Sequence, residues 1–215
     1  MDLDRRRFLF ASSALLAGAV DTACESASML AQTAMPATPP VVKLPAGLAP
    51  DLLAQARAAM DRHSEIRNRN RLALVDFNAA SSAPRFHLVD LISGKTDSYL
   101  VAHGSGSDPD HSGWLERFSN QPGSNASSSG AFVTSSYYVG KHGPSQRLIG
   151  LDPTNNNALS RAIVVHGAWY AEPGIATARG KLGRSQGCFA VGDSVKTEVM
   201  AKLGENTLIY ASKLS

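Results

Sequence analysis

The feature of this sequence that most constrains its fold is a series of short strand-like segments, separated by turns rich in Gly, Ser, Asn and Pro. In several of them apolar residues recur at every second position, which places them on one face of a strand. We predict strands at 72–77, 85–92, 96–103, 131–140, 147–151, 162–165 and 207–210. This pattern indicates a mainly β fold with few helices, either a sandwich or a partly closed barrel.

Two segments have helical spacing instead, at 51–64 and 193–203. Asp51 is placed to satisfy the first free amides of the earlier helix, and Gly204 closes the later one. A polar loop at 104–130 is too long for a simple connection, and loops of this length are usually functional or mobile. The chain has 215 residues, 43% of them hydrophobic and 18% charged, which suits one domain with additional segments and disfavours disorder of the whole.

The N-terminal segment has the pattern of an export signal. An arginine cluster at 5–7 precedes an apolar run at 8–20, which ends in small residues with an A-x-A spacing. The run is shorter than the ~18 apolar residues expected of a membrane span. The arginines, followed by Phe8 and Leu9, resemble a twin-arginine signal. We predict a signal peptide at 1–23 and an exported protein of the periplasm or cell envelope, with an ordinary core helix as the alternative.

The next segment, at 24–50, is rich in Ala, Thr and Pro and is typical of a linker, so we place the folded domain at 51–215. Cys24 lies at the start of this linker, where a lipid-anchored cysteine is one alternative. Asp21, three places upstream, fits a lipoprotein pattern poorly. We therefore expect a soluble product, and a membrane partner only if Cys24 is lipidated.

The net charge of +3 is modest, and the basic residues cluster in one run at 62–71. Such a run could contact an anionic surface, although it is more often a solvated helix end. No aromatic residues interleave with it, and export argues against a nucleic-acid partner. The sequence makes no prediction of oligomeric state.

Cys188 lies in a polar, Gly-rich loop with the sequence GRSQGCF. If the chain is cleaved after Cys24, Cys188 is its single cysteine in a compartment where thiols become disulfides. It is then a link to another molecule, an inert buried residue or a reactive thiol. A reactive thiol needs a base within hydrogen-bond reach, and His166, at the end of a predicted strand, is the candidate.

Gly187 has a possible chemical reason to precede the cysteine. Acyl transfer develops negative charge on the attacked carbonyl oxygen, and backbone amides stabilise this charge best where no Cβ blocks the approach. We expect the amides of Gly187 and Cys188 to serve as this oxyanion site. A structural turn would use the same glycine.

A segment of 17 residues separates His166-Gly167 from Ser185-Gln186-Gly187-Cys188. This motif resembles the signature of the YkuD-type L,D-transpeptidases. The phrases VAHGSGSDPDHSG, FSNQPGSNASSSG, YYVGKHGPSQRLIGLDPTNNNA and RAIVVHGAWY are similar to a branch of murein L,D-transpeptidase catalytic domain proteins. The resemblance extends over about residues 70–212.

This resemblance implies a role for each matching position. Cys188 would be the nucleophile and His166 its base, and the backbone carbonyl of Gly167 would orient the imidazole. Two positions depart from the family pattern. Gln186 replaces the family's second histidine, and Ala190 replaces a polar Asn or Arg.

The resemblance also implies an activity that needs neither cofactor nor metal. Such enzymes attack peptidoglycan stem peptides, release the terminal D-Ala and form a thioester. An amine then completes a cross-link, whereas water gives L,D-carboxypeptidase activity. The departures at Gln186 and Ala190 leave a further alternative, a non-catalytic cell-wall-binding module with the same fold.

Other polar residues are candidates for substrate binding. We place Ser185, Arg184 and Gln186 there, and either His103 or His142. Arg184 could meet a substrate carboxylate, although an exposed loop Arg is the commoner case. The histidines at 103, 111 and 142 could in principle bind zinc, but their irregular spacing disfavours a metal site. Tyr137 and Tyr138 could line the cleft or belong to the rim.

Overall fold

The computed structural model describes residues 41–214, so the predicted signal peptide at 1–23, Cys24 and most of the predicted linker lie outside the described residues. The described strands are β1 (Arg71–Asp76), β2 (Phe86–Asp90), β3 (Thr96–Tyr99), β4 (Gly130–Gly140), β5 (Gly143–Gly150), β6 (Val164–Gly167), β7 (Phe189–Val191) and β8 (Leu208–Ser212). The described helices are α1 (Pro50–Arg62), α2 (Pro173–Arg179) and α3 (Lys196–Leu203), with short 3₁₀ turns at η1 (Ser105–Ser107) and η2 (Trp169–Ala171).

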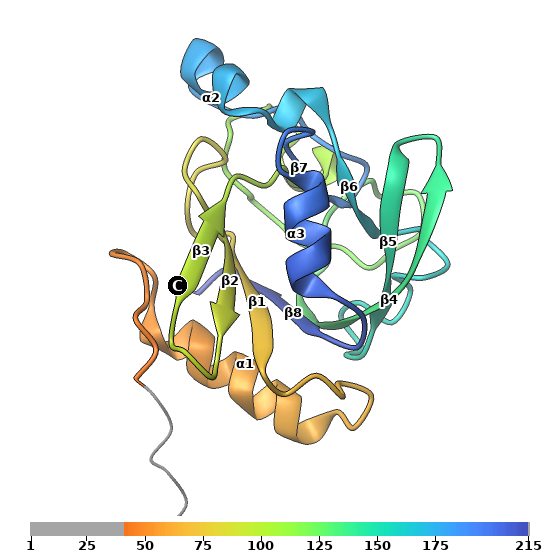
Figure 1. Cartoon of the computed structure of the whole chain (residues 1–215). Coiled ribbons are helices and arrows are strands. Elements are labelled where there is room, and N and C mark those ends of the chain that lie inside the picture. The colour runs from red at the N-terminus through yellow and green to blue at the C-terminus, as the bar shows by residue number, and fades with distance from the viewer. Residues whose placement is uncertain (1–40, 215) are drawn as a thin grey trace, which may run out of the picture. The chain divides into compact units, whose positions relative to one another are not determined.

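The strands form one mixed sheet in the order β3-β2-β1-β8-β4-β5-β6-β7 (Figure 1). Strands β1 and β8 pair in parallel, as do β6 and β7, and the other pairs are antiparallel. The sheet does not close, but an isolated bridge joins Ala102, just beyond β3, to Ala190 of β7. The prediction of a mainly β fold with few helices is therefore confirmed. The strands of the protein form a single open sheet whose two edges approach each other.

Helices α1 and α3 cover opposite faces of this sheet. Alternate residues of β1 show the division: Leu72 and Leu74 belong to the buried cluster with α1, whereas Ala73 and Val75 belong to the cluster with α3. Figure 1 shows α3 in front of the sheet and α1 beneath β1 and β2. Because successive strand residues point to opposite faces, the period-two pattern of this segment translates into two apolar layers.

Helix α1 begins differently from the expectation. Ala49 is its N-cap and makes no side-chain cap hydrogen bond, Pro50 occupies the first turn, and Asp51 follows it. Proline suits this position because its missing N–H would have no intrahelical partner. Asp51 therefore favours the helix through the charge of its first turn and not as a capping side chain.

The end of the predicted linker packs on the domain. Residues 41–49 contain no helix or strand, but the Lys43 amide donates to the Gly94 carbonyl at 3.0 Å, and Leu48 is buried. None of the helices among the described residues is long and apolar enough to cross a membrane.

Several elements around the cysteine differ from the sequence-based prediction. Strand β6 includes His166 and Gly167 themselves, and the hairpin between β4 and β5 turns at Lys141 and His142. Strand β7, immediately after Cys188, and helix α2 were not predicted. The cysteine is thus held between a tight loop and an edge strand.

Candidate active site

The loop that carries the cysteine, here called the cysteine loop (residues 183–188), is fixed by Ser185. The Ser185 amide donates to the His103 carbonyl at 2.9 Å, and its carbonyl accepts from the Ser105 amide at 2.9 Å. Within the loop, Ser185 Oγ donates to the Cys188 carbonyl at 2.7 Å and accepts from the Gly187 amide at 3.1 Å. Ser185 is buried, and these bonds make it a residue that shapes the loop.

Gly187 is required by the backbone. Its φ is +110°, a conformation that side chains disfavour, and a Cβ there would lie 2.7 Å from the Ala126 carbonyl oxygen. Its amide is already bonded to Ser185 Oγ. The Cys188 amide has no hydrogen-bond partner among residues 41–214. Of the two amides expected at the oxyanion site, only that of Cys188 is free to donate.

His166, on β6, is 1% exposed and has a defined tautomer. Its Nδ1 lies 2.8 Å from the Gly167 carbonyl oxygen, which can only accept, so Nδ1 carries the proton. Nε2 is then left with a lone pair that can take a proton. Burial lowers the pKa of His166, and the hydrogen bond to Gly167 partly opposes this effect. The ring is therefore neutral at neutral pH.

His142, from the turn between β4 and β5, stacks on His166. The ring centroids are 4.2 Å apart, with an angle of 19° between the planes. Burial, with a contribution from the Lys141 charge, lowers the pKa of His142. The stack packs the tip of the β4–β5 hairpin against the imidazole of His166.

Cys188 is 9% exposed, and its Sγ donates to the Ala162 carbonyl at 3.5 Å. No hydrogen bond joins Sγ to His166 in this structure. Burial raises the pKa of the thiol, while the Val164 amide and the charges of Lys141 and Arg161 act in the opposite direction. The thiol and the imidazole are thus both neutral, an arrangement suited to proton transfer during attack and not to a preformed ion pair.

Cys188 and His166 line one cleft with a volume of about 330 Å³. The residues that line this cleft are Tyr138, Lys141, His142, Arg161, Ala162, Val164, His166, Tyr170, Arg184, Ser185, Gln186 and Cys188. The structure therefore brings together the predicted nucleophile and base with His142, Arg184, Ser185 and Gln186. Gly187 lies beside Cys188 in the cysteine loop.

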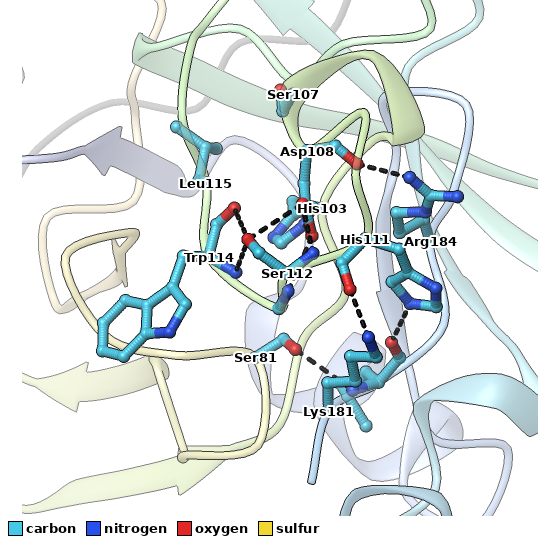
Figure 2. Close-up of polar contacts among 12 residues, drawn as sticks. Ser81, His103, Ser107, Asp108, His111, Ser112, Trp114, Leu115, Lys181 and Arg184 are labelled. Atoms are coloured by element: carbon cyan, nitrogen blue, oxygen red, sulfur yellow. Dashed lines mark hydrogen bonds and ion pairs between the residues drawn. The ribbon is translucent and has the colours of Figure 1, made fainter. Parts of the chain in front are cut away.

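His103 lies elsewhere, in a buried polar network (Figure 2). Arg85 donates to His103 Nδ1 at 2.8 Å, and His103 Nε2 donates to Asp108 Oδ2 at 3.1 Å. The His103 side chain is 1% exposed, and it is not among the residues that line the cleft. Both of its ring nitrogens are already bonded, so it does not take the substrate-binding position considered for it. Its contribution to the site is its backbone carbonyl, which holds the Ser185 amide.

Arg184 is connected to the same network. Its guanidinium donates to the backbone carbonyls of Asp108 and Pro109, and Figure 2 shows it reaching the Asp108 main chain. The Asp108 carboxylate is instead bonded to His103, Ser112 and Gly113. Arg184 thus ties the cysteine loop to the segment after η1 while part of its side chain lines the cleft.

Three polar residues that line the cleft were not identified from the sequence. Arg161 precedes the strand that leads to His166, Lys141 is adjacent to His142, and Tyr170 lies in η2. Burial, together with nearby negative groups, raises the pKa of Tyr170 to about 12. Their nearness to His142 and His166 in sequence was a signal for them, although isolated Lys, Arg and Tyr residues are common on surfaces.

The two departures from the family pattern occupy different environments. Gln186 is exposed at the mouth of the cleft. Ala190 is fully buried, pairs with His166 across β6 and β7, and bridges to Ala102. It belongs to a small apolar cluster that also contains Ala168 and Leu182, so a larger polar side chain would have to displace these neighbours.

Among residues 41–214, no three His, Cys, Asp or Glu side chains come together in a way that could hold a metal ion. The histidines at 103, 111 and 142 are separated: His111 Nε2 donates to the Leu182 carbonyl at 2.8 Å, His103 is enclosed, and His142 lies in the cleft.

The model of the L,D-transpeptidase catalytic domain family matches residues 46–212. The chain therefore belongs to this family. No protein of curated function matches it in sequence.

Solved structures with some similarity are also L,D-transpeptidases. LdtMt1 in complex with imipenem is 10% identical with a TM-score of 0.40, and the match covers 66% of this chain and 59% of that one. The Mycobacterium smegmatis L,D-transpeptidase is 12% identical with a TM-score of 0.40, covering 66% and 58%. The one from Xylanimonas cellulosilytica is 14% identical with a TM-score of 0.38, covering 66% and 60%. The match thus spans about three fifths of these proteins.

Proposed function

We propose that this protein is an exported cysteine acyltransferase that performs L,D-transpeptidation on peptidoglycan stem peptides. One observation carries the proposal: Cys188 lines the same cleft as a buried histidine whose Nδ1–H is held by the Gly167 carbonyl. This arrangement leaves Nε2 as the base. Family membership supports the substrate class, and the arginine cluster before the apolar run supports export.

In the proposed reaction, Cys188 Sγ turns from the Ala162 carbonyl towards His166 and transfers its proton to Nε2 as it attacks. The attacked carbonyl joins the third residue of the stem to the terminal D-Ala. The Cys188 amide donates to the developing oxyanion. Collapse breaks the amide bond, D-Ala leaves with the proton from Nε2, and a thioester to Cys188 remains.

The second half of the reaction regenerates the thiol. The neutral His166 takes a proton from an amine of a neighbouring stem as the amine attacks the thioester, and this proton passes to the departing Sγ. The product is a cross-link. Attack by water follows the same course and gives L,D-carboxypeptidase activity.

The experiment is incubation with a disaccharide tetrapeptide, with D-Ala release followed by mass spectrometry. We expect release by the unmodified protein and none by Cys188→Ala. No release by the unmodified protein, or full release by Cys188→Ala, contradicts the proposal.

The second candidate is a cell-wall-binding module without turnover. The observation that favours it is the thiol itself, which is buried and bonded to the Ala162 carbonyl and not to a base. Labelling with an electrophile separates the two functions, because reactivity follows the thiolate fraction. Fast, pH-dependent labelling that slows in His166→Ala supports catalysis, whereas slow labelling that is unaffected supports the binding module.

A further inference from the structure

The run of turns at 155–163, which leads into β6, ends with the hydrogen bonds of a Schellman motif. The Ala162 amide donates to the Leu159 carbonyl at 3.0 Å, and the Ile163 amide donates to the Ala158 carbonyl at 2.9 Å. In this motif the residue at the position of Ala162 adopts a left-handed conformation. Ile163 and Ala158 are buried in the same apolar cluster, a contact that often accompanies the motif. The backbone of Ala162 is therefore held in place from both sides.

An alanine is unusual at this position. The φ of Ala162 is +53°, and glycine is the residue that normally takes this conformation, because a Cβ disfavours it. Among residues 41–214, the other non-glycine residues with positive φ are His111, Asn125 and Asn206, which are types that adopt it more readily. The Ala162 side chain is exposed, so packing does not account for the conformation. Backbone strain of this kind is concentrated at functional sites.

The carbonyl of Ala162 faces the cysteine. Cys188 Sγ donates to it at 3.5 Å, and it accepts from no backbone amide among residues 41–214. A carbonyl oxygen can only accept, so it stabilises the protonated thiol and repels a thiolate. Burial also raises the pKa of the thiol, whereas the Val164 amide lowers it. Because the thiol is 9% exposed, water does not readily replace the carbonyl as its acceptor.

The charge state of the sulfur therefore depends on the direction in which it points. The titratable groups that line the cleft with it are His166, His142, Lys141, Arg161, Tyr170 and Arg184. Of these, Lys141 and Arg161 favour the thiolate through their charge, and His166 offers a lone pair at Nε2. Rotation of the side chain about its Cα–Cβ bond moves Sγ from an acceptor that keeps the proton on sulfur to a base that removes it.

We propose that Ala162 is a positioning residue, whose carbonyl holds the Cys188 thiol protonated and turned away from His166 in the resting protein. The left-handed backbone at Ala162 places this carbonyl. The inference rests on the proposed function, and it adds that the reaction begins with rotation of the thiol out of this resting position.

The first test detects the hydrogen bond itself. The S–H stretching band in the infrared lies apart from the other bands of a protein, and it moves to lower frequency when the thiol donates a hydrogen bond. A difference spectrum between the unmodified protein and Cys188→Ala isolates the band of Cys188. We expect this band at lower frequency than that of an alkyl thiol in an apolar solvent. An unshifted band overturns the inference.

The second test uses the exposed position of Ala162. Ala162→Val places a β-branched residue where φ is positive, so the motif must open and the carbonyl moves away from Sγ. With this acceptor lost, we expect labelling by iodoacetamide at pH 7 to be about fivefold faster, and the pH profile of the rate to move to lower pH. Ala162→Gly adopts the left-handed conformation without strain and should label within about twofold of the unmodified protein, with the same S–H band.

The matched control is Asn206→Val, which introduces the same side chain at a left-handed residue before β8 and outside the cleft. Its labelling rate should equal that of the unmodified protein. Equal rates in Ala162→Val and Ala162→Gly, or a similar increase in Asn206→Val, overturn the inference. The infrared band requires no change at Ala162, so it decides the question if Ala162→Val does not fold.

The proposed function is judged separately, by D-Ala release from the unmodified protein. Release together with an unshifted S–H band leaves the function standing and removes the inference. A shifted band and faster labelling of Ala162→Val, without any release, leave the resting position of the thiol standing and remove the function.

Discussion

The regions around His166 and His103 show how the same side chain is used in two ways. Both histidines are buried to 1% exposure, and both are neutral. Their tautomers are opposite: His103 accepts a hydrogen bond from Arg85 at Nδ1 and donates one from Nε2, whereas His166 donates one from Nδ1. A histidine with both nitrogens bound is part of the framework, and one with a free nitrogen facing a cleft is available for chemistry.

The surroundings of His103 explain why it remains neutral. Burial, reinforced by the Arg85 charge, lowers its pKa to about 4, although Asp108 opposes this effect. Hydrogen bonds from Gly113, Ser112 and His103 outweigh desolvation and lower the pKa of Asp108 to about 2. The network is therefore a charged Arg and a charged Asp joined by a neutral imidazole, and it supports the segment to which the cysteine loop is bonded.

Variants of His166 and His103 are expected to differ most in catalysis. His166→Gln removes the base and should lower kcat for D-Ala release by a factor of about 10²–10⁴ at temperatures where the variant is folded. His103→Gln should keep most of the activity at temperatures where it is folded. If His103→Gln loses activity as His166→Gln does while still folded, the division between the two histidines is wrong.

The second contrast is in stability. Asp108→Asn places an amide against the donors of His103, Ser112 and Gly113, so the free energy of unfolding should fall by about 3 kcal/mol. Asp97→Asn is the control, because its pair with Lys202 is largely exposed and should contribute less than about 1 kcal/mol. Urea denaturation measures both, and equal losses would contradict the structural role of Asp108.

The third contrast is in pH dependence. Because folding lowers the pKa of His103 from 6.5 to about 4, the unfolded chain binds a proton in this range that the folded protein does not. Stability is therefore complete above pH 6.5 and falls on acidification towards pH 4, with a slope from this group of up to about 1.4 kcal/mol per pH unit. His103→Gln should flatten the curve of unfolding free energy against pH. An unchanged slope would show that other groups cause it.

The smallest effect concerns the stacked ring on His166. His142→Phe keeps an aromatic ring over the imidazole and should retain kcat within about twofold, whereas His142→Ala should lower it by a factor of about 2–10. Steady-state kinetics of both variants measure this. A larger loss in His142→Phe than in His142→Ala would indicate that the nitrogens of His142, and not its stacking, matter.

Local pattern was enough for the mainly β fold. The need of a reactive thiol for a base, together with the family resemblance, indicated His166 as the partner of Cys188, and both line one cleft. Strand β7 was missed since three residues, Phe189–Val191, are too few to show a period. Helix α2 was missed because it has seven residues, mostly small ones.

The remaining site residues depend on tertiary contacts. Arg161 lies beside Gly187 of the cysteine loop and is held there by bonds to residues more than thirty positions away, and no sequence spacing indicates this. His103 lies in a Gly-rich loop like His142, but its partner Arg85 is contributed by the segment before β2. The sequence shows both histidines in similar settings, and only the fold distinguishes them.

In the proposed reaction His166 activates Cys188, which then forms a thioester with the acyl donor. Intact-mass measurement of the purified protein after brief exposure to a tetrapeptide tests this most directly. We predict a mass increase equal to the tetrapeptide acyl group without D-Ala, located on the peptide that contains Cys188. It should be absent in Cys188→Ala and form far more slowly in His166→Gln. No mass increase in the unmodified protein, or the same increase in Cys188→Ala, would contradict the account.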